Sequence, residues 1–407
     1  MRPTECVRRA MYVLLIGATA LGAGCAGPPR RPAVPAGLQE RAVVPGFGPE
    51  IRTYVTPVNE AFLAELRAAT MREAEAWAAA GHAGPLPRAE FLAISGGGQN
   101  GAFTAGLLNG WTDSGTRPEF KVVTGISTGA LIAPFAFLGS SHDATLREAY
   151  TKTRTPDILI PRPLLAALTS DALADNQPLW RMVERQIDQR LLDEIAAEYA
   201  KGRILVVGTT DLDARRGVIW NVTAIAASRH PQALPLVRKI LVASAAIPAA
   251  FPPVMIDVEV DGRSYQELHV DGGAMAQLFL YPPSMKIKEL AAAAGIVRER
   301  RAYVVRNARL DPDWAQTERR TLPIAVRAID SLLHTQGIGD LYRTYVNAQR
   351  DDVDYNLAFI PATFRVRPKE AFDPAYMQAL FDVGYELARN GYPWQKTPPG
   401  FEADANP

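Results

Sequence analysis

Cysteine and histidine are both scarce in this sequence. Only Cys6 and Cys25 occur among its 407 residues, and histidine occurs five times. Two cysteines cannot form the dense set of disulfides that stabilises small secreted domains. The fold must therefore depend on its apolar core, and few imidazoles are available for catalysis.

Neither sign of charge predominates. The chain has 44 Lys and Arg against 43 Asp and Glu, for a formal net charge of +1, and it contains no basic run. A nucleic-acid-binding protein would carry a basic face, so this class of protein is excluded. With 48% hydrophobic and 21% charged residues, the composition is that of a globular protein. The length allows one large α/β domain or two smaller ones.

The N-terminus combines basic residues with a short apolar run. Arg2, Arg8 and Arg9 precede Met11–Gly24, which is shorter than the ~20 apolar residues that span a membrane. This pattern is typical of an export signal, and we predict a signal peptide at residues 1–24. Its removal would take away three Arg and one Glu and change the net charge from +1 to −1. Attraction to anionic lipid through bulk charge is therefore not expected.

Two processing sites follow the apolar run. Leu21–Cys25 resembles the lipobox of bacterial lipoproteins, although its leucine lies four residues before the cysteine instead of three, whereas Ala18–Ala20 would suit an ordinary signal peptidase. We predict lipidation of Cys25 in an exported protein anchored to a bacterial membrane, in the outer membrane or periplasm. A secreted form or an uncleaved anchor is the alternative. Residues 25–57, rich in Pro, Gly and Arg, are predicted to form a tether.

Beyond the tether, apolar runs alternate with longer stretches of helical periodicity. Strands are predicted at residues 91–95, 121–124, 204–208, 218–225, 239–242, 254–260, 265–270, 302–306 and 354–360. Helices are predicted at residues 60–80, 102–111, 128–138, 144–153, 179–199, 324–350 and 374–389. The alternation predicts one α/β domain, residues 58–395, whose largely parallel sheet is covered on both faces, followed by a tail at residues 396–407. Asp261-Gly262 predicts a β-hairpin within it.

A glycine-rich segment is the first that suggests chemistry. Residues 95–103 read SGGGQNGAF, at the end of a predicted strand and the start of a helix. Helix N-termini have unpaired N–H groups, and an anion can approach them closely where side chains are absent. Gly96, Gly98 and Gly101 satisfy the dinucleotide-binding pattern G-x-G-x-x-G. The same N–H groups could form an oxyanion hole for an acyl intermediate, or the segment could be a tight turn without a ligand.

The next strand argues against a dinucleotide. Such a site requires an acidic residue at its end, about 20 residues on. Instead, the strand leads into Gly125-Ile126-Ser127-Thr128-Gly129. This is the G-x-S-x-G pattern of a nucleophile elbow, in the required strand–turn–helix context. Gly125 and Gly129 are expected because larger residues there would clash with the strand or the helix, so we interpret Ser127 as a nucleophile.

A serine nucleophile needs a base, and no histidine has the position expected for a catalytic triad. The five are His82 before the serine, His142 and His230 in predicted loops or helix ends, His269 on a strand, and His334 within a helix. A triad histidine is not excluded by sequence alone. Val270-Asp271-Gly272-Gly273 offers a carboxylate at the end of a strand, although Asp-Gly is also common turn chemistry.

The glycine-rich loop, the G-x-S-x-G motif and Asp-Gly-Gly, in this order, resemble the patatin-like phospholipase family. The segments GISTGAL at 125–131, DNQPL at 175–179 and ASAAIPAAFPP at 243–253 add to the resemblance, which covers residues 89–391. It implies a three-layer α/β/α sandwich with a mostly parallel central sheet. It also implies a Ser-Asp dyad that uses no metal and no other cofactor.

The resemblance implies a role for each motif. Ser127 would be the nucleophile, Asp271 the base, and the N–H groups of Gly96, Gly97 and Gly98 the oxyanion hole. The reaction implied is hydrolysis of fatty-acyl esters of lipids at a membrane surface, through an acyl-enzyme.

Two residues depart from the family pattern. Asn100 stands where the family often has Arg or Lys, and Ser95 where it often has Asp. Without a cation beside the oxyanion loop, the sequence offers no special contact for a phosphate headgroup. The residues needed for acyl transfer are still present. A lysophospholipase, lipase or general esterase with the same dyad is therefore an alternative. A lipid-binding lipoprotein with an inactive dyad is another, and the presence of both Ser127 and Asp271 argues against it.

Overall fold

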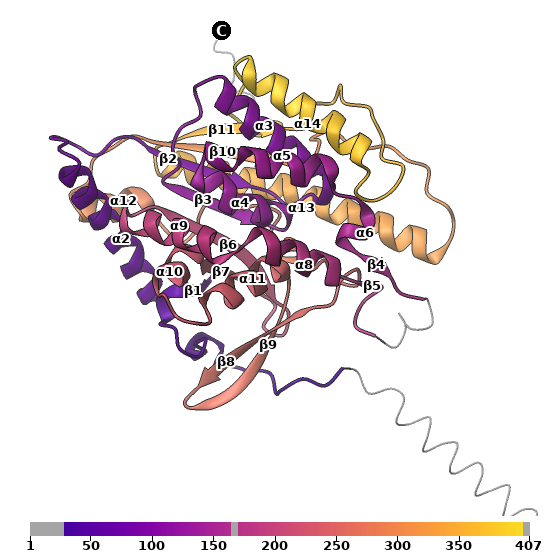
Figure 1. Cartoon of the computed structure of the whole chain (residues 1–407), viewed down its shortest axis with the longest axis horizontal. Helices are drawn as coiled ribbons and strands as arrows, with labels where there is room; N and C mark the ends of the chain where they lie inside the picture. Colours follow the sequence, from indigo (N-terminus) through magenta and orange to yellow (C-terminus); the bar gives the residue numbers. More distant parts are fainter. Residues whose placement is uncertain (1–27, 164–169, 402–407) are drawn as a thin grey trace, which may run out of the picture.

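A computed structural model describes residues 28–163 and 170–401, and its main feature is a nine-stranded sheet in the order β1-β7-β6-β3-β2-β10-β11, with β9 paired to β6 and β8 paired to β9 (Figure 1). The strands are β1 Arg52–Tyr54, β2 Ala89–Ile94, β3 Val122–Ile126, β6 Ile204–Asp211, β7 Arg216–Asn221, β8 Val254–Val260, β9 Arg263–Asp271, β10 Arg300–Arg306 and β11 Val353–Phe359. A separate pair, β4 Ile160–Pro161 and β5 Ala174–Asp175, is antiparallel.

The five strands β6, β3, β2, β10 and β11 run parallel, and the remaining pairings in this sheet are antiparallel. All six residues of β2 are buried, as expected for a parallel strand covered on both faces. The predicted α/β sandwich is therefore confirmed, with antiparallel strands added on one side of its parallel centre.

Helices cover both faces of the sheet (Figure 1). Those of the larger apolar core are α3 Gly101–Asp113, α4 Thr128–Leu138, α5 Asp143–Lys152, α8 Gln177–Gln186, α9 Gln189–Ala200, α10 Val222–Ala227, α11 Ala233–Ser244 and α14 Pro374–Arg389. The helices that cover the opposite face of the sheet are α2 Glu60–Ala79, α12 Ile287–Ala293 and α13 Thr321–Arg350. A short helix, α6 Thr155–Ile158, precedes β4. None of the helices in the described part of the chain has the length and apolarity needed to cross a bilayer.

Helices α3 and α14 lie unusually close together. A Cβ atom at Gly106 would stand 2.0 Å from the Phe381 carbonyl oxygen, and one at Gly110 would stand 2.1 Å from that of Tyr385. Only glycine permits this approach. The contact holds α3, which begins directly after the glycine-rich segment, firmly against the domain.

Three predicted elements differ from the structure. The apolar run at 239–242 belongs to α11 instead of a strand, and the predicted strand 218–225 ends at Asn221, where α10 begins. Short buried apolar runs have no periodicity that separates a strand from a helix. The predicted helix 179–199 is two helices, because Asp188 caps the N-terminus of α9 by accepting a hydrogen bond from the Leu191 N–H. The hairpin at Asp261-Gly262 is confirmed.

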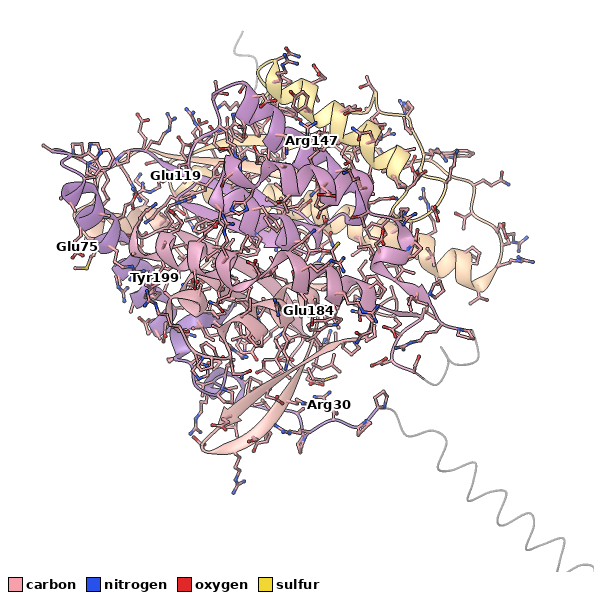
Figure 2. The ribbon with its side chains drawn as sticks, in the orientation of Figure 1. Arg30, Glu75, Glu119, Arg147, Glu184 and Tyr199 are labelled. Carbon is pink, nitrogen blue, oxygen red and sulfur yellow. The ribbon has the colours of Figure 1, made fainter. Side chains whose placement is uncertain are left out.

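The segment predicted as a tether packs against the domain from about residue 30. Arg30 forms an ion pair with Asp213 and lies beside the β8–β9 hairpin (Figure 2). Val34 and Val44 are buried in the larger core, and β1 adds a strand to the sheet. Composition alone could not show this, because the pairing partner of β1 lies more than 160 residues away. The signal peptide and Cys25 lie outside the described residues.

Candidate active site

Ser127 lies at the sharp turn between β3 and α4. Its φ of +56° and ψ of −125° are rare for a residue other than glycine. The Ser127 N–H donates to the Ser244 hydroxyl at 2.9 Å, and that hydroxyl donates to the Gly208 carbonyl at 2.6 Å. The turn is therefore held in a strained conformation by two buried hydrogen bonds, as expected of a functional site.

The two elbow glycines have no room for a side chain. A Cβ atom at Gly125 would stand 2.4 Å from the Gly129 carbonyl oxygen, and one at Gly129 would stand 2.3 Å from that of Ile94. Both neighbours are backbone atoms, which cannot turn aside as a side chain could. Any larger residue would therefore displace Ser127 relative to the sheet.

The glycine-rich segment passes directly beside the serine. A Cβ atom at Gly96 would stand 3.2 Å from that of Ser127, and Gly97 and Gly98 have φ values of +150° and +56°. The Gly96 N–H donates to the Gln277 carbonyl at 3.0 Å. Of the three predicted oxyanion donors, Gly96 is thus already engaged in this structure. The N–H groups of Gly97 and Gly98 have no hydrogen-bond acceptor among the described residues.

Asp271 and Ser127 lie close together because the strands that precede them, β9 and β3, both pair with β6. In the sheet register Ile126, just before the serine, pairs with Gly208, while Asp271 pairs with the next residue of β6, Thr209. This brings together two side chains separated by 144 positions, and the Ser127 hydroxyl lies close enough to the Asp271 carboxylate to favour its ionised form. The two side chains predicted to act together are therefore neighbours in the fold.

The environment of Asp271 favours its neutral form. Burial raises the pKa of this carboxyl group to about 7, although hydrogen bonds from Ser127 and from the Gly273 N–H favour the ionised form. A base with a pKa near neutral pH can both accept a proton and release it again. The site therefore combines a serine on a strained turn with a carboxylate suited to general-base catalysis.

The rate of ester hydrolysis by this chain is expected to rise with pH and to be half-maximal near pH 7, because only ionised Asp271 can accept the serine proton. The profile is measured as kcat/KM on a soluble ester. Since imidazole titrates in the same range, the profile is repeated at several temperatures. The pKa of a carboxyl group hardly changes with temperature, whereas that of an imidazole falls on warming, and a falling midpoint would contradict Asp271 as the base.

None of the described histidines hydrogen-bonds Ser127 or Asp271. His142 pairs with Glu194, His82 stacks on Trp77, and His230 packs on Phe47. His334 lies on α13, as predicted, and lines a polar cavity there. His269 is fully buried on β9, two residues before Asp271.

His269 belongs to a buried hydrogen-bond chain. The Trp220 indole N–H donates to the Thr209 hydroxyl at 2.8 Å, so this hydroxyl can donate its own proton to Nδ1 of His269 at 2.9 Å. Nε2 then carries the hydrogen and donates to Glu267 at 3.0 Å, and Arg52 donates two hydrogen bonds to the same carboxylate. Both imidazole nitrogens are thus occupied. His269 can position the strand that bears Asp271 but is not free to serve as a base.

His269→Ala is expected to lower the free energy of unfolding by about 2–4 kcal/mol, because it leaves a cavity and an unpaired hydroxyl. It is expected to lower kcat by less than about tenfold, with the midpoint of the pH profile unchanged. Thermal unfolding and the pH profile measure the two effects. His269→Gln, which can keep part of the hydrogen bonding, serves as the matched variant. A folded His269→Ala protein as inactive as one without Ser127 would contradict a positioning role.

Three residues that hold the site were missed by sequence analysis. Asn307 is fully buried, donates its N–H to Ser95 and its amide to the Ser95 carbonyl, and so secures the glycine-rich loop. Gln277 accepts from Gly96 and donates to Gly273, which joins that loop to the Asp271 turn. Ser244 holds the elbow as described above. The only sequence signal was a polar residue beside an apolar run, which is too common to select them.

An apolar cavity of about 60 Å³ adjoins the nucleophile. Ser127 and Gly98 belong to its wall, and α4, α5 and α8 supply mainly apolar side chains, among them Leu131, Phe135, Leu146, Leu179 and Met182. An ester bound with its carbonyl at Ser127 could place a hydrocarbon chain there. In residues 28–163 and 170–401, no three or more His, Cys, Asp or Glu side chains are arranged to hold a metal ion.

The chain was compared with known proteins. Residues 92–282 match the family model described as "Patatin-like phospholipase". The chain is similar to the crystal structure of VipD from Legionella pneumophila, with a TM-score of 0.36 and 11% identity over 75% of this chain and 66% of that chain. It is similar to the type III effector protein ExoU, with a TM-score of 0.31 and 12% identity over 75% of this chain and 53% of that chain. It therefore spans less than two thirds of either protein's length. No curated protein matches the sequence.

Proposed function

Because residues 92–282 match the model of the patatin-like phospholipase family, we propose that this chain is a lipid acyl hydrolase that acts through a Ser127–Asp271 dyad and an acyl-enzyme. The observation that carries the proposal is the proximity of the two side chains, which the register of β6 brings together at a strained turn beside the glycine-rich loop. The family match supports lipid acyl hydrolysis in general. The dyad and the roles of single residues are our own assignment.

The first half of the reaction forms the acyl-enzyme. Ionised Asp271 accepts the hydroxyl proton of Ser127 while Oγ attacks the ester carbonyl. The oxyanion that develops is stabilised by the N–H groups of Gly97 and Gly98, which have no other acceptor among the described residues. The alcohol then leaves, taking the proton held by Asp271.

The second half releases the fatty acid. Asp271, ionised again, accepts a proton from water as the water attacks the acyl-enzyme. Asp271 then returns this proton to the Ser127 oxygen, which leaves as the hydroxyl. Burial of Asp271 suits this cycle, because a carboxyl group with a pKa of about 7 holds and returns the proton at little cost. The apolar cavity beside Ser127, of about 60 Å³, would hold the first few carbons of the acyl chain throughout.

The substrate class is tested by product analysis. The purified chain is incubated with vesicles of mixed phospholipids, lysophospholipids and triacylglycerol, and the released fatty acids and alcohols are identified by mass spectrometry. We expect fatty acids to be released and Ser127→Ala to release none. Release from lysophospholipid or triacylglycerol alone would favour a lysophospholipase or lipase with the same dyad. Lipid binding without any release would favour the inactive lipid-binding alternative.

We further propose that the protein is exported and anchored to a membrane through acylated Cys25, on the basis of the Leu21–Cys25 pattern. Cys25→Ser is expected to move the protein from the membrane fraction to the soluble fraction of the producing cell. Immunoblots of the two fractions measure this. Cys6→Ser, within the predicted signal, is the control and should leave the distribution unchanged. An unchanged distribution of Cys25→Ser, with a mature N-terminus at Leu21, would support secretion instead.

A further inference from the structure

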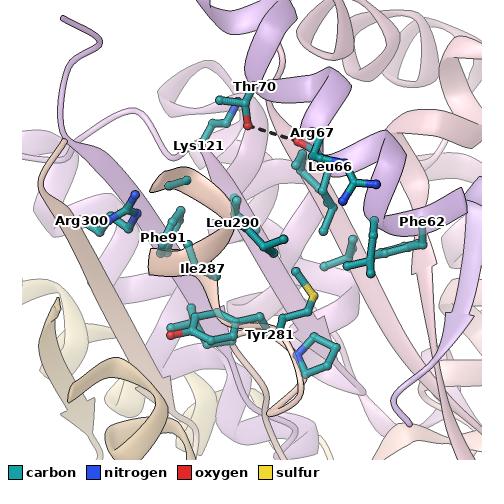
Figure 3. A pocket seen from close by; sticks show the side chains of 18 of the residues that line it. Phe62, Leu66, Arg67, Thr70, Phe91, Lys121, Tyr281, Ile287, Leu290 and Arg300 are labelled. Carbon is teal, nitrogen blue, oxygen red and sulfur yellow. Dashed lines mark hydrogen bonds between the residues drawn. The ribbon is translucent and has the colours of Figure 1, made fainter. Parts of the chain in front are cut away.

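A second cavity, of about 160 Å³, lies on the other face of the sheet, between α2, α12 and the strands (Figure 3). Its floor consists of apolar strand side chains that point to this face: Phe91, Val122, Ile204, Val206 and Ile219. Leu66 of α2 and Leu290 of α12 face each other across it (Figure 3). The walls are therefore largely hydrocarbon.

The second cavity is separate from the catalytic one. No residue of its lining lines the cavity beside Ser127. Val122 in its floor precedes Ser127 by five residues of an extended strand, or about 16 Å along the chain. The helices that cover the two cavities also lie on opposite faces of the sheet. A ligand in this cavity would therefore not touch the dyad.

Every ionised side chain in the lining is a cation: Arg67, Lys121, Arg298 and Arg300. Two of these share a partly buried partner outside the lining, because Glu73 binds Lys121 at 2.7 Å and Arg298 at 2.6 Å. Arg67 is half-exposed and lies 4.0 Å from Glu60. Each of these three cations therefore already has an acidic partner in the described chain, with Lys121 and Arg298 sharing one carboxylate.

Arg300 is the exception. Its half-buried guanidinium has no hydrogen bond or ion pair within residues 28–163 and 170–401, and it lies next to Phe91 at the cavity (Figure 3). Burial and the neighbouring Arg298 lower its pKa, although Asp351 attracts its charge. A guanidinium presents paired N–H donors that match a carboxylate. A ligand with one anionic group and an apolar tail would compensate the charge of Arg300 with the anionic group and fill the cavity with the tail.

We propose that this second cavity binds one fatty acid, with the hydrocarbon chain between α2 and α12 and the carboxylate on Arg300. A cavity of ~150 Å³ holds benzene, so about six to eight carbons fit here. One unpaired guanidinium suits one negative charge. The choice of a fatty acid rests on the proposed function, whose product it is, but binding to this cavity does not require the dyad.

The test is calorimetric titration of the full chain with octanoate and with octan-1-ol, which share a chain length and differ in charge. Octanoate is expected to bind about tenfold more tightly to this cavity, through its charge-assisted hydrogen bonds. Arg300→Gln is expected to abolish that difference. Arg301→Gln is the matched control, because Arg301 is adjacent on β10, pairs with Asp354 at 2.8 Å and does not line the cavity.

A second pair of variants tests the place of binding. Ala291→Phe on α12 adds a ring to the lining and is expected to remove one equivalent of bound octanoate, whereas Ala292→Phe, exposed on the same helix, should remove none. Circular dichroism checks that each variant is folded. Absence of octanoate binding, equal affinity for octanol, or binding unaffected by both Arg300→Gln and Ala291→Phe would overturn the proposal. Because octanoate is not hydrolysed, an inactive chain that binds it would contradict only the proposed reaction.

Discussion

Replacing Ser127 by alanine is expected to reduce ester hydrolysis by about a thousandfold or more, because the nucleophilic hydroxyl is lost and the neighbouring Thr128 hydroxyl is engaged with Tyr150. The fold should persist. The backbone hydrogen bond to Ser244 does not involve the Ser127 hydroxyl, and alanine can adopt the same strained φ at a similar cost. Initial rates on a soluble ester and a thermal melt together measure the two outcomes.

Ser228→Ala is the matched control for this substitution, because the Ser228 hydroxyl bonds only locally at the end of α10, donating to the Ile225 carbonyl and accepting from the His230 N–H. It should leave the rate unchanged. Residual activity above a few per cent in a clean Ser127→Ala preparation would mean that another residue is the nucleophile. Trapping the acyl group by denaturing the enzyme during turnover, followed by mass spectrometry, should find it on the peptide that contains Ser127.

The second large effect is expected for Asp271→Asn. An amide cannot accept the serine proton, so the rate should fall about as far as in Ser127→Ala. In a Ser-His-Asp enzyme the same change would leave the histidine as base, in a poorer orientation. Asp261→Asn, in the exposed Asp-Gly turn of the hairpin, is the matched control and should be fully active. Both are measured as kcat/KM on one soluble ester.

Asp271→Asn should also change stability in a pH-dependent way. The pKa of Asp271 is about 7 in the folded protein and near 3.8 when unfolded, so the wild type loses stability as pH rises between these values. The variant does not. Between pH 5 and pH 8 its free energy of unfolding should therefore rise relative to wild type by about 3 kcal/mol. Urea unfolding at the two pH values measures this, and shows that inactivity is not caused by unfolding.

The histidines complete the test of the base. Substituting His82, His142, His230 and His334 one at a time should leave most of the activity, because none hydrogen-bonds the dyad in the described chain. If one of these four proves as essential as Ser127, the dyad is the wrong assignment and a triad must replace it. His269 is not part of this panel, since its substitution also disturbs the strand that bears Asp271.

The elements that sequence analysis located well are those with a local signal. The helix at 60–80, the elbow at 125–129 and the Asp-Gly hairpin each follow from periodicity, glycine spacing or turn chemistry within a few residues. The run at 239–242 was misassigned because its apolar residues are buried in either conformation. The packing of β1, within the segment predicted as a tether, was not foreseen because its pairing partner β7 is distant in sequence. Local patterns do not contain that information.

The active site likewise has features that follow from local sequence and features that depend on distant segments. By itself, the sequence determined the elbow turn, the glycine-rich loop and an aspartate at the end of a strand, because each depends on the conformations open to glycine and to a few neighbours. Only the tertiary structure decided that Ser127 and Asp271 meet, since their contact depends on the register of β6 with both β3 and β9. It also decided the pKa of Asp271, which burial by distant segments raises, and the engagement of the Gly96 N–H by Gln277. Register and burial are properties of the packed chain, and no short stretch of sequence specifies them.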